Sequence, residues 1–172
     1  PELNVGNPTQ TAREATATIN INVLATAIDN TPIIDMDSTA TFNGAGPFPI
    51  VWPDSTAIVS ANDADQLDVA LLVHHGTLTF DPSLPSGVTT VTNTQGPPGD
   101  TEVYLRGPQT LLNYSLNNLQ YTPYSYAMAA PYDHFTGNDL LTVTVMDNGA
   151  HLANREPVER TTEQTLQIQV NP

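Results

Sequence analysis

The chain has 172 residues and no cysteine, and it carries 18 acidic residues against four arginines and no lysine. The net charge of −14 argues against nucleic-acid or anionic-membrane partners, because contacts to phosphate need Lys or Arg. The missing cysteines exclude disulfides, thiolate zinc sites and cysteine nucleophiles. The longest apolar run, 69–73, is far shorter than the about 20 residues that span a bilayer, so we expect no membrane insertion. Two uses of the acids remain open: chelation of divalent cations, or a solvated surface.

The runs between Pro, Gly, Asn and Asp residues are rich in Thr, Val, Ile and Tyr, which is typical of strands separated by turns. Strands are predicted at 15–23, 56–60, 67–73, 76–80, 102–105, 119–123, 140–146 and 165–170. A short helix is predicted over 109–119, where leucines recur at helical spacing after Pro108. Residues 44–53 and 82–99 are predicted to be long loops. This order predicts an all-β fold, an antiparallel β-sandwich of the Ig-like or cadherin-like Greek-key type.

Two alternating runs resemble each other. Residues 14–21 and 163–170 both start at a Glu and are offset by about 149 residues. One interpretation is that 1–31 holds the terminal strand of a preceding repeat plus a linker, and that 32–172 is one full repeat. A second is that both runs are edge strands of a single sandwich. In a third, residues 15–23 are a donor strand that completes a neighbouring subunit of a fibre.

Short acidic turns follow several of the predicted strands, at 29–32, 62–65 and 146–149. Each places side-chain oxygens at the end of a strand, and Ca²⁺ takes about 6–8 oxygen ligands. Each also has the composition of a plain turn, since Asx side chains cap turns without metal. The sequence alone leaves both interpretations open.

The order of these turns resembles cadherin-like repeats. That family has an Asp-Asn-x-Pro linker, here Asp29 to Pro32, then an Asp-x-Asp turn, here Asp63 to Asp65, and later an Asp-x-Gly turn, here Asp147 to Gly149. The resemblance implies that these elements converge on Ca²⁺ at the junction between repeats. The implied ligands are Asp29, Asn30, Asp63, Asp65 and Asp147. Residues 33–60 contain no Glu, which favours one or two ions over three.

The middle of the chain resembles the chondroitin sulfate proteoglycan-type repeats of large bacterial surface adhesins. The matching segments are His-Gly-Thr-Leu-Thr-Phe at 75–80, Leu-x-x-Leu-x-Tyr-Thr-Pro at 116–123, and Phe-x-Gly-x-Asp-x-Leu-x-Val-x-Val at 135–145. The resemblance implies an extracellular or cell-surface protein. Its partners would be neighbouring repeats or subunits of the same protein, with a glycan or cell-surface partner as a further option.

Catalytic patterns are missing from the sequence, which contains no Gly-x-Ser-x-Gly segment and no Gly-rich phosphate loop. Adjacent residues on a strand point to opposite faces, so His74 and His75 are expected to have a surface or strand-end role and not to bind one ion together. Asp139 is expected to have a structural role. We therefore expect a non-catalytic, calcium-binding structural repeat of an adhesin or surface fibre. The rival to this expectation is a carbohydrate-binding module of a secreted enzyme, with the tyrosines of 121–132 stacking on sugar.

Overall fold

The computed structural model describes residues 31–53, 57–58, 66–94, 101–125, 134–147 and 159–172. Its elements are β1 Thr39–Asn43, β2 Phe48–Pro49, β3 Leu67–Val73, β4 Gly76–Phe80, β5 Thr89–Thr94, β6 Thr101–Gly107, α1 Gln109–Asn117, β7 Leu119–Pro123, β8 Gly137–Asp147 and β9 Arg160–Asn171. The predicted strands at 67–73, 76–80 and 119–123 are confirmed at their stated bounds, and the helix after Pro108 is confirmed. The predicted strand at 15–23 lies outside the described residues.

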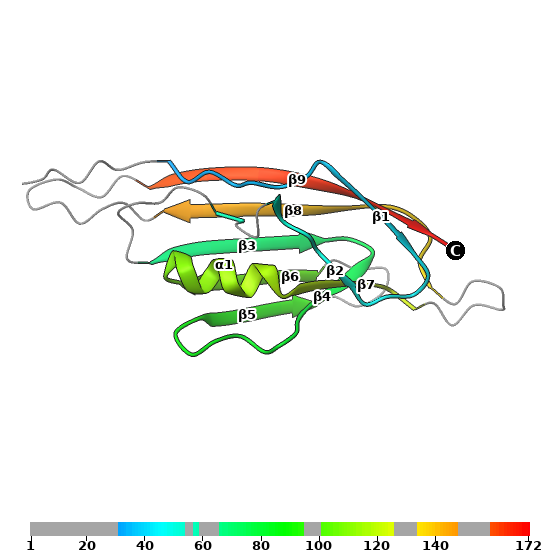
Figure 1. The fold of residues 1–172 in the computed structure, drawn as a ribbon, viewed down its shortest axis with the longest axis horizontal. Coiled ribbons are helices and arrows are strands. Elements are labelled where there is room, and N and C mark those ends of the chain that lie inside the picture. The colour runs from blue at the N-terminus through cyan, green and yellow to red at the C-terminus, as the bar shows by residue number, and fades with distance from the viewer. Residues whose placement is uncertain (1–30, 54–56, 59–65, 95–100, 126–133, 148–158) are drawn as a thin grey trace, which may run out of the picture.

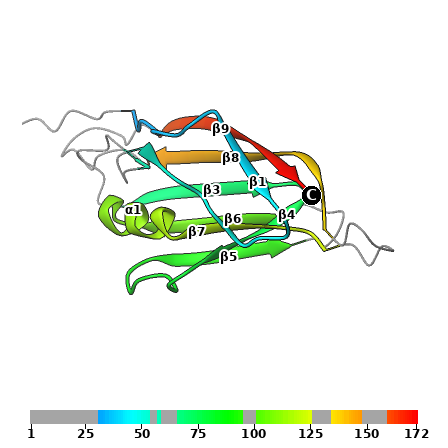
Figure 2. The same ribbon diagram turned by 45° about the vertical axis from the view of Figure 1, so that its right-hand side comes forward.

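The strands form two packed sheets, which confirms the all-β sandwich (Figure 1). The large sheet has six strands in the order β1-β9-β8-β3-β6-β5, and the small sheet has three in the order β2-β7-β4. All pairings between these strands are antiparallel except that of β1 with β9, which is parallel. Helix α1 lies with the small sheet over the middle of the large one (Figures 1 and 2).

The core forms where the two layers face each other. β3 alternates strictly between buried and half-buried positions, so Leu67, Val69, Leu71 and Val73 enter the core, while Ala70 and Leu72 lie on the opposite face. The second layer contributes Tyr121 from β7 and Leu112 and Leu116 from α1, all fully buried. At the corner between the sheets, the rings of Phe42 and Phe48 stack with their centroids 4.6 Å apart. The small layer is thereby held against the β1 side of the large sheet.

Two expectations about loops are wrong. Residues 82–99 were expected to be a loop, yet they contain the strand β5. Residues 44–53 contain the short strand β2, which pairs with β7. The segment predicted as a strand at 56–60 is described only at 57–58, where Ile58 forms an isolated bridge with Ile34.

Candidate functional site

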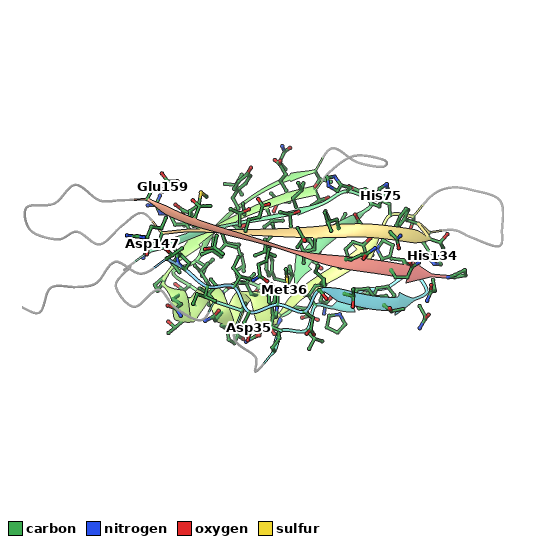
Figure 3. The ribbon with its side chains drawn as sticks, turned by 90° about the horizontal axis from the view of Figure 1, so that it is seen from above. Asp35, Met36, His75, His134, Asp147 and Glu159 are labelled. Atoms are coloured by element: carbon green, nitrogen blue, oxygen red, sulfur yellow. The ribbon has the colours of Figure 1, made fainter. Side chains whose placement is uncertain are left out.

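The large sheet has two ends, which we name by the labelled residues of Figure 3. At the Asp147 end lie Asp147 and Glu159, and at the His75 end lie His75 and His134 (Figure 3). The strands run between these ends along the long axis of the domain (Figure 1). Among the described residues, the predicted calcium ligand Asp147 and the buried Asp139 carboxylate therefore lie at opposite ends.

At the Asp147 end the strand register brings three segments together. Asp147 is the last residue of β8, and it pairs with Leu67 at the start of β3 and with Arg160 at the start of β9. Arg160 in turn donates a hydrogen bond of 3.3 Å from Nη1 to the hydroxyl of Thr31. The Thr162 hydroxyl donates to the carbonyl of Pro32 at 2.6 Å, which fixes the incoming chain beside β9.

Each segment at this end adjoins one of the predicted acidic turns. Thr31 directly follows Asp29 and Asn30 in the sequence, and Leu67 follows Asp63 and Asp65 by a few residues. Those four residues lie outside the described part of the chain. The topology therefore brings together the flanks of all three turns, although they are more than 110 residues apart in sequence, from Thr31 to Asp147.

Asp147 differs from its expected setting on a loop. It ends a strand and is fully buried. Buried carboxylates in proteins are hydrogen-bonded, paired with a cation or bound to metal, because an isolated buried charge is costly. Among the described residues, no group of three or more His, Cys, Asp or Glu side chains is placed to hold a metal ion. The described residues thus contain one of the five predicted ligands.

At the His75 end, Asp139 has the structural role expected of it. Its side chain is fully buried, and its carboxylate accepts hydrogen bonds from the backbone N–H of His74 at 3.1 Å and of His75 at 2.9 Å. The carboxylate also accepts a bond of 2.8 Å from the Tyr121 hydroxyl. No local sequence pattern indicates this network, because its members are distant in the chain.

The two histidines lie in the turn between β3 and β4, in agreement with the strand-end role expected of them. Both border a shallow hollow of about 410 Å³ together with Ser38 and Asp139. The His75 ring stacks on Phe135 with the ring centroids 4.3 Å apart, and its Nδ1 is 3.5 Å from Oδ1 of Asp139. These contacts hold the turn in place.

The tyrosines assigned to sugar stacking divide into two groups. Tyr121 and Tyr124 are buried, so neither presents a ring face to a ligand. The Tyr124 hydroxyl is 3.1 Å from the Thr101 hydroxyl inside the sandwich. Tyr126 and Tyr132 lie outside the described residues. Trp52 is also buried, and its Nε1 donates to the carbonyl of Leu116 at 2.7 Å.

Comparisons with known proteins return no match from family models, from curated proteins or from solved structures. Within the described residues, no helix is long and apolar enough to cross a membrane. The assignment of function therefore rests on the geometry of the chain itself.

Proposed function

We propose that this chain is a non-catalytic, calcium-binding structural repeat of an extracellular adhesin or surface fibre. Calcium would bind at the Asp147 end and stiffen the junction with the neighbouring repeat. The observation that carries the proposal is the convergence of the flanks of all three acidic turns at that end, through the pairing of Asp147 with Leu67 and Arg160.

The path of the chain supports an end-to-end arrangement of repeats. Thr31 lies beside Arg160 at the Asp147 end, and β1 then runs parallel to β9. At the far end Asn171 donates from Nδ2 to Oδ1 of Asn43 at 3.1 Å. The described chain thus begins at one end of the long axis and finishes at the other (Figure 1). Neighbouring repeats joined at these points would lie in line.

The mechanism that we propose is electrostatic. Carboxylates gathered at a junction repel one another when no cation is present, and a bound ion that takes oxygens from the linker and from both turns would cross-link them. An ion that binds only the folded state adds about 2.7 kcal/mol to the free energy of unfolding at a concentration 100 times its Kd. The ligands would be Asp29, Asn30, Asp63, Asp65 and Asp147.

Thermal unfolding in EDTA and in millimolar Ca²⁺ tests the proposal. We expect calcium to raise the Tm by several degrees, and Asp63→Asn to remove most of that rise. Glu102→Gln is the matched control, because it removes one charge from the start of β6, at the His75 end of the same sheet. A cooperative transition with the same Tm in both buffers would refute calcium binding, and an equal loss in both variants would refute the assignment of the site.

The burial of Tyr121 and Tyr124 weighs against the carbohydrate-binding alternative. Strand donation through residues 15–23 stays a prediction, since those residues lie outside the described part of the chain. Retention on immobilised glycans after replacement of Tyr126 and Tyr132 tests the first, and the association state of a chain that lacks 1–26 tests the second.

A further inference from the structure

The strand β5 forms one border of the large sheet and pairs only with β6 among the described strands (Figures 1 and 2). All six residues of Thr89–Thr94 are exposed, including those on the face that continues the core side of the sheet. The small sheet and α1 therefore do not cover this strand. Its outer backbone N–H and C=O groups are directed away from β6, where another strand can pair with them.

The edge lacks the features by which proteins usually prevent such pairing. Its sequence, Thr-Thr-Val-Thr-Asn-Thr, contains no charge and no proline. The register with β6 runs without a break from Thr89 opposite Arg106 to Thr94 opposite Thr101, so no bulge interrupts it. Charged residues, proline and bulges are the common means of protecting an edge strand. The opposite border, β1, is preceded by two acids, Asp35 and Asp37.

The sequence of β5 is complementary to itself in one antiparallel register. A two-fold axis normal to the sheet at Val91 places Val91 opposite Val91 of the second copy. Thr90 then faces Thr92 of the second copy, and Thr89 faces its Asn93. The two side chains of each opposed pair lie on the same face of the sheet, and successive pairs alternate between the two faces. Threonine pairs and β-branched pairs directly opposite each other stabilise antiparallel sheets.

The neighbouring strand extends this complementarity. Tyr104 lies opposite Val91 in the β5–β6 register, and both side chains are exposed, Val91 by 66% and Tyr104 by 45%. Across the two-fold axis they would form one apolar row of four side chains. In each adjacent row, Arg106 of one copy pairs with Thr89, Thr89 faces Asn93 of the second copy, and that Asn93 pairs with Glu102. Each of these rows therefore contains one positive and one negative side chain.

We propose that β5 is a docking edge for a second copy of this chain, which pairs antiparallel with Val91 at the two-fold axis. Because the strands follow the long axis, the two copies would lie side by side, in contrast to the end-to-end junction at Asp147. The proposal does not rest on calcium binding. Each copy carries −14, so association should strengthen as salt screens the repulsion beyond about 10 Å at 0.1 M.

Disulfide cross-linking of the full chain tests the register. The chain has no cysteine, so Val91→Cys introduces its single thiol. Opposed residues of an antiparallel pair have Cα atoms about 4.5–5.5 Å apart, which lies within the range that a disulfide bridges. We expect Val91→Cys to form a covalent dimer rapidly on oxidation in EDTA and moderate salt. Asn93→Cys is the register control, because the two Asn93 residues would be about 13 Å apart along the strands.

The exposed Val51→Cys controls for random collision, since Val51 is 70% exposed and lies outside β5. Equal cross-linking of the three variants would overturn the proposal. Sedimentation equilibrium of the wild-type chain supplies a second measurement, in which Val91→Lys should weaken dimerisation about tenfold or more by opposing like charges. A wild-type chain that stays monomeric at millimolar concentration would also overturn it. Association that survives Val91→Lys but disappears when residues 1–26 are deleted would instead identify the N-terminal segment as the docked strand.

Discussion

The hydroxyl of Tyr121 donates a buried hydrogen bond of 2.8 Å to Oδ2 of Asp139, and this contact joins the two sheets of the sandwich. Tyr121 belongs to β7 in the small sheet and Asp139 to β8 in the large one. The same carboxylate accepts the backbone N–H groups of His74 and His75, so it also fixes the turn that carries the chain from β3 to β4. One side chain thereby fixes the connection between the layers at the His75 end.

Replacement of Asp139 should therefore destabilise the fold strongly. Asp139→Leu removes the acceptor of three backbone N–H groups, those of His74, His75 and Leu140, and of the Tyr121 hydroxyl. Each unsatisfied buried group costs about 1–3 kcal/mol. We expect the free energy of unfolding in urea to fall by about 3 kcal/mol or more. Asn138→Ala is the control, because Asn138 is exposed and adjacent in the chain. A change in Asp139→Leu no larger than in the control would mean that the network adds little stability.

Gly76 should tolerate no side chain, for a reason visible in the packing. A Cβ atom built at Gly76 would lie 2.6 Å from the carbonyl oxygen of Thr122 and closer still to the ring of Tyr121. The carbonyl belongs to the paired strand β7 and cannot move without breaking the ladder. We expect Gly76→Ala to lower the free energy of unfolding by about 1–3 kcal/mol. Thr77→Ala, one residue along the same strand, should have a smaller effect, and equal effects would contradict the packing argument.

The elements that could be predicted from the sequence are those with one covered face. In both Leu67–Val73 and Leu119–Pro123 burial alternates along the strand. In Leu119–Pro123 the sequence alternates with it, whereas Leu67–Val73 is recognisable as a short apolar run. The strand β5 could not be predicted from the sequence, because both of its faces are exposed. Thr89–Thr94 contains a single apolar residue, Val91, so apolar and polar residues do not alternate along it.

The candidate site shows the same division. Acidic turn residues at strand ends can be recognised in sequence, but the register that places Asp147 beside Leu67 and Arg160 arises only in the folded sheet. The Asp139 network depends on contacts across 64 and 65 residues to the histidine N–H groups. A local pattern cannot report such contacts, although the Asp in the segment 135–145 was correctly expected to be structural.

Asn113 should be important for the segment that precedes the predicted ligands Asp63 and Asp65. Its Oδ1 accepts from the N–H of Ile58 at 2.8 Å, and its Nδ2 donates to the carbonyl of Ile58 at 3.0 Å. Asn113→Ala removes both bonds at once and should cost about 1–3 kcal/mol in urea unfolding. Tyr114→Ala on the exposed face of α1 is the control, since the side chain is 48% exposed. A loss in the control as large as in Asn113→Ala would point to lost side-chain packing on α1 and not to these bonds, because alanine favours the helix more than either residue that it replaces.

Asp147 and Asp139 offer a direct separation of metal binding from structural support. Both residues are buried. Asp139→Asn should lower the Tm in EDTA, because its carboxylate accepts hydrogen bonds from Tyr121 and from the turn at His74 and His75. Of the two, only Asp147 lies at the end where the described flanks of the acidic turns meet. We expect Asp147→Asn to reduce the additional rise in Tm that Ca²⁺ produces, because it replaces a charged oxygen ligand with a neutral one. Asp139→Asn should keep that rise in full, because its carboxylate is occupied by Tyr121 and by the turn.

The measurement is the difference in Tm between EDTA and millimolar Ca²⁺ for each variant. An unchanged difference in Asp147→Asn would remove this residue from the calcium site, even if its stability in EDTA falls.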